Sequence, residues 1–255
     1  TWWDDDHVEQ REQATLTQLE AALETPTAAV ILEPLVQGAG GMSMVRPAFL
    51  QEVQKRVRNA GTLLIADEVL TGFGRCGDFL ATQRAGIKPD LVSLSKGLTA
   101  GFLPMGITMA SGAVFDAFVG TEPSLTLWHG HSFTANPLGC AAANASLDLL
   151  EAEPEKYLGF EARHRSHLEL LASHPGIKHV RVIGTIAAFD LVVSDQEGYL
   201  NPAGKVLRRL ARDRGILVRP LGQVVYLLPP LCISEDQLSH CYAVLQEALD
   251  LLQDQ

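Results

Sequence analysis

The sequence lacks paired cysteines, long apolar runs and an excess of positive charge. Its four cysteines stand apart without a CxxC pair, which favours reduced thiols and a reducing compartment such as the cytoplasm. No apolar run approaches membrane-spanning length, and no basic-then-apolar signal precedes a small-residue cleavage site. The formal net charge of -10 argues against nucleic acid or an anionic membrane as the main partner. We therefore expect a soluble, cytoplasmic protein.

The composition is that of an ordinary globular protein with a substantial core. The chain has 255 residues, of which 47% are apolar and 20% are charged. Around Glu151 to Glu155 the sequence becomes rich in glutamate, and Pro154 marks a break. This shift predicts two units, a larger one over residues 1–152 and a smaller α+β unit over residues 153–255.

The larger unit alternates apolar, strand-like runs with glycine turns and helical stretches. Three such runs end at Glu33, Asp67 and Lys96, respectively. This alternation is typical of a mostly parallel α/β sheet, in which the strand ends open on one edge where ligands bind. We therefore expect these three side chains to lie along the same edge.

Capping signals mark several helices in the second half of the chain. Asn136 followed by Pro137 predicts the start of an Ala-rich helix, and Ser234 with Gln237 forms a capping-box pattern before the last helix. Ser111 is expected to cap a short helix whose inner face carries Val114, Phe115 and Phe118.

Lys96 and Asp67 form the pair with the clearest chemical use. A strand-end amine can form a Schiff base with an aldehyde cofactor, and a nearby carboxylate can keep a pyridinium nitrogen protonated. Taken alone, the two residues favour a structural ion pair or two solvated surface charges, and only the surrounding residues favour the chemical role. His129 and His131 could suggest a metal, but no carboxylate or cysteine stands at ligand spacing, so we interpret them as hydrogen-bonding groups.

The motifs around these residues resemble those of one known family. Glu33-Pro34 with the glycine loop at 37–41, Ala66-Asp67-Glu68-Val69 with the glycine-rich turn at 71–75, and Ser95-Lys96-Gly97 are similar to the class III aminotransferases. Those are pyridoxal-phosphate enzymes of fold type I, with a mostly parallel sheet flanked by helices and a smaller α+β C-terminal domain. The resemblance covers essentially the whole chain.

The resemblance implies a role for each matching residue. Lys96 would hold pyridoxal 5'-phosphate as a Schiff base and shuttle a proton, and Asp67 would pair with the ring nitrogen. His131 and Ser132 match the family segment that reaches the cofactor phosphate of the neighbouring subunit, which implies a homodimer with shared sites. The remaining residues expected at the cofactor are Val69 and Glu33, although a structural carboxylate is an alternative for Glu33.

Later segments are similar to the biotin-pathway branch of this family. They are residues 128–138, 216–222 and 225–230. This branch transfers an amino group from S-adenosylmethionine to 8-amino-7-oxononanoate, giving 7,8-diaminononanoate. The resemblance implies that Arg219 grips the substrate carboxylate and that Gly130, Arg75 and Tyr226 also contact substrate. A class III amine–pyruvate or omega-transaminase remains the alternative activity.

The front of the chain departs from the family pattern. The family's long N-terminal region supplies a phosphate loop and aromatics of the active site, and none is found before Glu33. The opening residues resemble the middle of the family's chain. A second hypothesis is therefore that the chain alone is a fragment unable to turn over.

Overall fold

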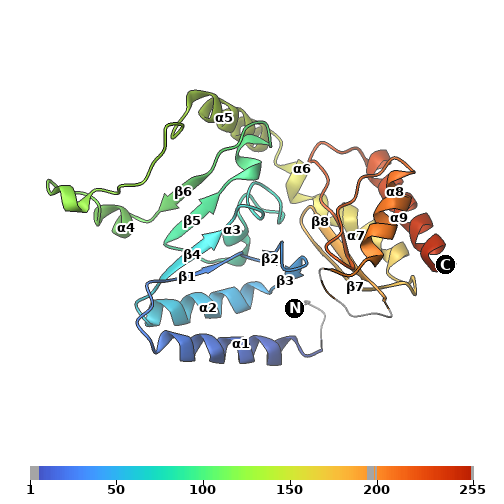
Figure 1. Cartoon of the computed structure of the whole chain (residues 1–255), viewed down its shortest axis with the longest axis horizontal. Coiled ribbons are helices and arrows are strands. Elements are labelled where there is room, and N and C mark those ends of the chain that lie inside the picture. The colour runs from blue at the N-terminus through green and yellow to red at the C-terminus, as the bar shows by residue number, and fades with distance from the viewer. Residues whose placement is uncertain (1–5, 194–197, 199, 254–255) are drawn as a thin grey trace.

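The fold is built on two β-sheets that lie side by side, each with its own helices (Figure 1). The computed structural model describes residues 6–193, 198 and 200–253. The first sheet contains β1 (Ala29–Leu32), β4 (Leu63–Asp67), β5 (Leu91–Leu94) and β6 (Ile107–Ala110). The second contains β7 (Ile177–Ile183), β8 (Ile186–Leu191) and β9 (Val224–Leu227). A short hairpin of β2 (Val36–Gln37) and β3 (Ser43–Met44) lies between them.

The first sheet has the strand order β1-β4-β5-β6 and is mostly parallel. β1 pairs with β4 and β4 with β5 in parallel, while β6 runs antiparallel to β5. The expected α/β class is confirmed. The three parallel strands end at or just before Glu33, Asp67 and Lys96, so the sequence-based expectation of one shared edge is also confirmed.

Two long helices pack against one face of this sheet (Figure 1). They are α1 (Val8–Leu23) and α2 (Pro47–Asn59). Leu16 of α1 and Val53 and Val57 of α2 form an apolar cluster with Leu64 of β4, because helical spacing places these residues on one stripe. The much shorter α3 (Ala81–Ala85) ends at Gly86, whose φ of 67° needs a glycine.

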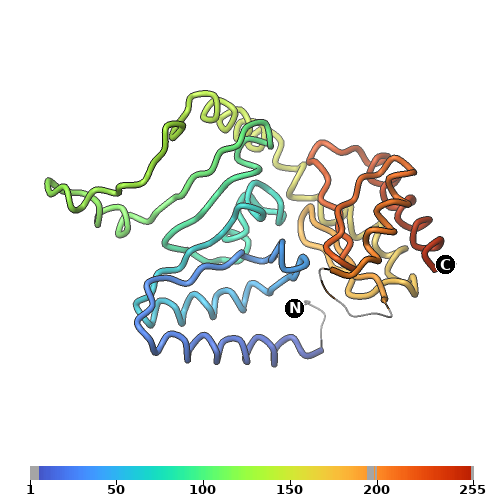
Figure 2. The backbone as a smooth tube through the Cα atoms, in the orientation of Figure 1, coloured from blue at the N-terminus to red at the C-terminus, as the bar shows by residue number. Residues whose placement is uncertain are grey.

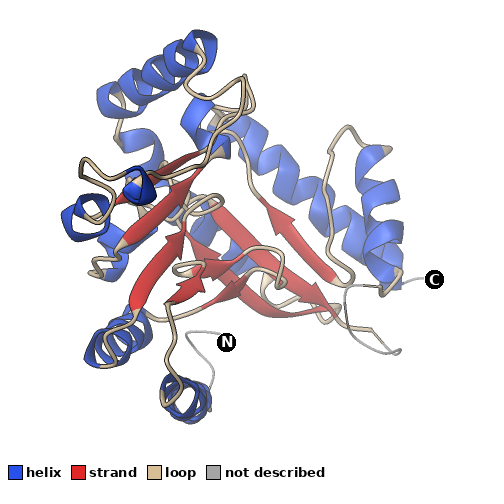
Figure 3. Cartoon of the chain, turned by 60° about the vertical axis from the view of Figure 1, so that its left-hand side comes forward, coloured by secondary structure: helices blue, strands red, loops and turns tan. Residues whose placement is uncertain are grey.

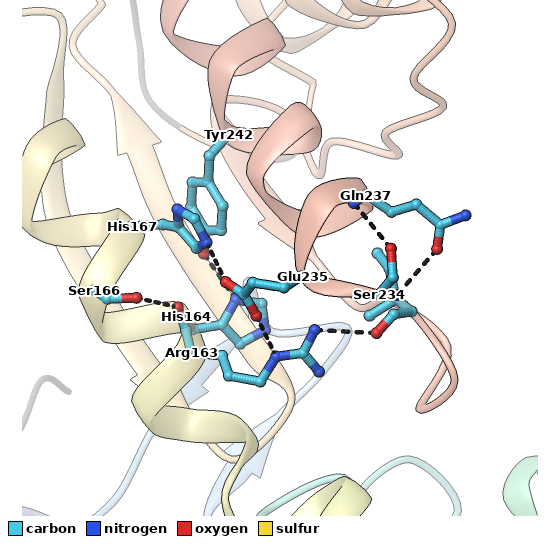
Figure 4. A network of polar contacts seen from close by, with 9 residues as sticks. Arg163, His164, Ser166, His167, Ser234, Glu235, Gln237 and Tyr242 are labelled. Carbon is cyan, nitrogen blue, oxygen red and sulfur yellow. Dashed lines mark hydrogen bonds and ion pairs between the residues drawn. The ribbon is translucent and has the colours of Figure 1, made fainter.

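The second sheet is antiparallel throughout and carries three helices (Figure 3). These are α7 (Phe160–Leu171), α8 (Ala203–Arg212) and α9 (Glu235–Gln253). The predicted capping box is confirmed (Figure 4): the Ser234 amide donates to Gln237 Oε1 at 3.0 Å, and the Gln237 amide donates to Ser234 Oγ at 3.2 Å. The last helix is thus fixed at its start.

The two sheets share part of their apolar core. Leu35, Met42 and Met44, from the segment around β2 and β3, pack in one cluster with Ile183 and Ile186 of the second sheet. We call the first sheet with its helices the larger half and the second sheet with its helices the smaller, or second, half. The chain passes from one to the other through α5 (Pro137–Ala152) and α6 (Glu155–Leu158). The division at residues 152 and 153 stays a prediction.

A buried arginine also joins the two halves. Arg181 of β7 pairs with Asp190 of β8 at 2.8 Å. Its other nitrogens donate to the carbonyl oxygens of Gly41 at 2.7 Å and Met42 at 3.0 Å. The buried guanidinium, which Asp190 holds on the second sheet, thus binds the turn between β2 and β3 to that sheet.

The segment after β6 extends away from the rest of the chain (Figure 2). It contains α4 (Gly112–Asp116) and a 3₁₀ turn at Pro123–Leu125. The expectation that Phe115 and Phe118 lie on an inner face is wrong, since they are 63% and 45% exposed. Ser111 precedes α4, but its hydroxyl makes no capping hydrogen bond. Asn136 does cap α5, accepting from the Gly139 amide at 2.8 Å. No helix within the described part of the chain is both long and apolar enough to cross a membrane.

Candidate active site

Lys96 and Asp67 lie on neighbouring strands at the same edge of the first sheet. Asp67 is the last residue of β4 and is paired with Ser93 of β5, so Lys96 lies three residues beyond that level. Lys96 is exposed, and Asp67 is half-buried. Since β4 and β5 are parallel, the two side chains follow the strand ends to one edge of the sheet.

The backbone around Lys96 is strained and held in place by its neighbours. Lys96 has a φ of 43°, in the left-handed region that costs a non-glycine residue energy, and it begins a 3₁₀ helix that ends at Thr99. Ser146 of α5 donates to the Gly97 carbonyl at 3.0 Å. A Cβ at Gly97 would lie 2.9 Å from the Cβ of Phe73. This packing fixes the backbone that carries Lys96 at the strand end.

Asp67 is oriented by the backbone that follows it. Its Oδ1 accepts a hydrogen bond from the Val69 amide at 3.0 Å. Val69 thus contacts Asp67 through its amide, and its role at a cofactor stays a prediction. Among the described residues, no hydrogen bond to Asp67 Oδ2 is recorded, so this oxygen is available to a positively charged ligand nitrogen.

Glu68, beside Asp67, was missed by the sequence analysis. Its side chain is fully buried, and Oε2 accepts from the Ala81 amide at 2.7 Å and from Thr71 Oγ1 at 3.3 Å. Oε1 accepts from the amide and the hydroxyl of Thr82 at 2.9 and 2.6 Å. Four donors thus stabilise a buried carboxylate that ties the end of β4 to the start of α3. The only sign of this role in the sequence is that an acidic residue stands between the apolar strand at 63–66 and the glycine-rich turn at 71–77.

Glu33 fixes the glycine loop that follows β1. Its Oε2 accepts from the Gly38 amide at 3.0 Å, and a Cβ at Gly38 would lie 2.3 Å from Leu70 Cδ2. The loop thus packs closely against the end of the Leu70 side chain. This contact fits the structural alternative for Glu33, and its role towards a cofactor stays a prediction.

A cavity of about 630 Å³ opens beside Lys96 between the two halves of the chain. Arg75 adds positive charge to its wall, whereas Lys156 is ion-paired with Glu153, which lines the same cavity. Most of the remaining lining is apolar: Leu70, Phe73, Leu149, Leu150, Leu228, Pro230 and Leu231. Such a cavity suits a ligand with an aliphatic body and an anionic group.

Arg75 is held at this cavity by residues of the second half. Its Nη1 donates to the Pro229 carbonyl at 2.8 Å and to Thr185 Oγ1 at 3.4 Å. Burial lowers the pKa of the Arg75 guanidinium, which nevertheless stays charged. The structure therefore brings together Lys96 and Arg75 on one cavity.

Asp67, Val69 and Glu33 are not part of this cavity lining, and five other predicted residues also lie outside it. Gly130, His131 and Ser132 are exposed on the segment that extends beyond β6, and Arg219 is exposed after α8. Tyr226 is half-buried in β9. Their roles stay predictions. Within the described ranges no group of three His, Cys, Asp or Glu residues could hold a metal ion.

Comparison with known proteins defines the class of this chain. The family model described as "Aminotransferase class-III" matches residues 3–249. The chain belongs to the class III aminotransferase family.

Three similar proteins narrow the comparison further. An adenosylmethionine-8-amino-7-oxononanoate aminotransferase of Synechococcus elongatus is 55% identical over 251 residues, which are 98% of this chain and 59% of the relative. One of the same name from Geobacter sulfurreducens is 40% identical, over 92% of this chain and 54% of the relative. A solved amine transaminase from an uncultivated Pseudomonas species, in its PLP-bound form, is 34% identical with a TM-score of 0.87, covering 98% of this chain and 59% of its own. The chain thus spans somewhat more than half the length of these proteins.

Proposed function

We propose that this protein is a pyridoxal-phosphate-dependent aminotransferase of biotin biosynthesis, which transfers an amino group from S-adenosylmethionine to 8-amino-7-oxononanoate. The observation that carries the proposal is Lys96, exposed at a strand end one strand away from Asp67, in a chain of the class III family. The name of the 55% identical relative supports this choice of donor and acceptor.

The side chains at the sheet edge suit the chemistry of pyridoxal phosphate. The cofactor carries an aldehyde, which an exposed lysine amine can bind covalently, and a ring nitrogen, which a carboxylate can keep protonated. Lys96 and Asp67 supply these two groups on adjacent strands. When bound, pyridoxal phosphate would supply an electron sink for the carbon that bears the transferred amino group.

The chain's own residues would divide the remaining work. Lys96 Nζ would hold the cofactor and, once released by the amino donor, would take up and return a proton at the substrate carbon. Asp67 Oδ2 would hold positive charge at the ring nitrogen, with Oδ1 kept in place by the Val69 amide. Glu33 would keep the Gly38 loop in shape at the same edge.

The cavity beside Lys96 supports an aliphatic keto acid as the acceptor. Its leucine- and phenylalanine-rich wall would accommodate the carbon chain, and Arg75 would attract the carboxylate. Arg219, Tyr226 and Gly130 complete the proposed substrate contacts, although they lie outside the cavity lining in the single chain.

A homodimer would explain the exposed segment after β6. Trp128 and Phe133 are 83% and 74% exposed, and all four residues of β6 are exposed, which is unusual for an apolar strand. We propose that a second copy covers this surface and that His131 and Ser132 reach the cofactor phosphate of that copy. A mixture of Lys96→Ala and Ser132→Ala chains would then regain activity, because one site of the hybrid keeps both residues.

The amino donor distinguishes the proposed activity from its alternative. The alternative is an amine–pyruvate or omega-transaminase, and the likeness to the solved amine transaminase favours it. That protein is 34% identical to this chain, however, whereas the Synechococcus elongatus relative is 55% identical. The test incubates the purified protein and pyridoxal phosphate with 8-amino-7-oxononanoate and either S-adenosylmethionine or 1-phenylethylamine. Formation of 7,8-diaminononanoate only with S-adenosylmethionine supports the proposal. Rapid turnover of 1-phenylethylamine with pyruvate, and none of 8-amino-7-oxononanoate, would overturn it.

A further inference from the structure

Arg75 is a half-buried cation in the wall of the cavity beside Lys96. Among the described residues, no carboxylate forms an ion pair with it, and its recorded partners are the neutral oxygens of Pro229 and Thr185. A guanidinium placed this way in a cavity wall retains donors for an anion, because Nε and Nη2 donate to none of the residues that the structure describes.

Thr185 contacts Arg75 in two ways from the turn between β7 and β8. The Thr185 amide donates to the Arg75 carbonyl at 2.9 Å, and the hydroxyl lies 3.3 Å from the same oxygen. The hydroxyl also lies 3.4 Å from Arg75 Nη1. One fully buried residue therefore orients both the backbone and the guanidinium of Arg75.

The turn approaches the Arg75 segment too closely to tolerate a side chain before Thr185. Gly184 has a φ of 53°, and a Cβ on it would lie 2.5 Å from the Arg75 carbonyl oxygen and 2.3 Å from the Gly77 amide nitrogen. The Gly184 amide donates to Glu161 Oε2 at 2.9 Å, which also receives Arg84 at 2.9 Å. The turn is thus fixed against the larger half.

A buried histidine supports Thr185 from behind. His164 Nε2 lies 3.1 Å from the Thr185 carbonyl, which only accepts, so this nitrogen carries the proton. Nδ1 then accepts from the Tyr242 hydroxyl at 2.8 Å (Figure 4). His164 is fully buried, and burial lowers its pKa to about 4, so it is neutral at pH 7. The neutral ring therefore donates to the Thr185 carbonyl and accepts from the Tyr242 hydroxyl.

We propose that Thr185, supported by His164 and Tyr242, positions the Arg75 guanidinium for a substrate carboxylate, so that the smaller half determines the preference of the Lys96 cavity for an anionic ligand. This inference rests on the proposed function, in which the cavity binds an aliphatic carboxylate. Thr185 and His164 are positioning residues, because neither lines the cavity.

Isothermal titration calorimetry of the purified protein with octanoate, and with uncharged octanamide, tests the proposal. Thr185→Val and His164→Phe should raise the Kd of octanoate about fivefold to tenfold, because a hydrogen bond to a charged group is lost or misaligned. Both should leave octanamide within about twofold. Thr185→Ser keeps the hydroxyl and should bind octanoate like the wild type. His174→Phe is the matched control, since His174 is a buried histidine of the same half whose partners are Gly176 and Asp250.

The outcomes separate this inference from the proposed function. If Thr185→Val binds octanoate as tightly as wild type, the positioning role is overturned. This result is decisive even when His164→Phe does not fold. An equal loss for octanoate and octanamide would overturn it too. If Arg75→Met weakens octanoate while Thr185→Val does not, the role of Arg75 stands and only the positioning falls. If Arg75→Met has no effect, Arg75 is not the carboxylate site, and both its proposed role and the positioning by Thr185 are overturned.

Discussion

Replacement of Glu68 by glutamine should destabilise the protein strongly, although the two side chains have nearly the same shape. The glutamine oxygen can retain the hydrogen bonds from Thr82, but its amide would face the Ala81 amide, which now donates at 2.7 Å. The Thr71 hydroxyl can turn to accept from the new amide, but the charge-assisted hydrogen bond from Ala81 is lost and its buried N–H is left without an acceptor. Together these effects should lower the free energy of unfolding by about 2–4 kcal/mol.

Urea unfolding followed by far-UV circular dichroism measures this difference. Glu52→Gln is the control, because Glu52 is an exposed carboxylate of α2 paired with Arg56, and its loss should cost no more than about 0.5 kcal/mol. If Glu68→Gln unfolds within about 0.5 kcal/mol of wild type, the four hydrogen bonds do not stabilise the end of β4 and the reasoning is refuted.

Three other changes test the joint between the two halves. His164 has a pKa of about 4 when folded and 6.5 when unfolded, so the unfolded chain binds its proton first. The free energy of unfolding should therefore rise by about 3 kcal/mol between pH 4 and pH 6.5. In His164→Gln, urea unfolding at the same pH values should show the pH dependence without this rise. Gly184→Ala should cost about 2–4 kcal/mol, measured by urea unfolding, because its Cβ would meet the Arg75–Gly77 backbone. Arg181→Met should cost about 3–5 kcal/mol by leaving Asp190 buried without its guanidinium, and Asp190→Leu in the same chain should recover part of the loss.

Features encoded by neighbouring residues could be predicted from the sequence. The Ser234–Gln237 capping box and the Asn136 cap involve residues three apart, and both are confirmed. The parallel edge with Asp67 and Lys96 also follows from a local alternation of strand, glycine turn and helix. Such signals need no knowledge of distant contacts.

Features that depend on distant partners could not be predicted. Nothing near Arg181 indicates that Gly41 and Met42 will supply its acceptors, and Thr185 meets Arg75 only after both halves have folded. The exposed Phe115 shows another limit, because an amphipathic pattern shows which face of a helix is apolar but not what covers it. The cavity between the halves depends on the same long-range packing.

The measurement that most directly tests the central claim is the visible absorption spectrum of the purified protein with added pyridoxal phosphate, followed by borohydride reduction and peptide mapping. The account predicts a yellow protein whose reduced cofactor is fixed to the peptide containing Lys96, and no label at this position in Lys96→Ala. A cofactor fixed to another lysine, with Lys96 unmodified, would contradict it.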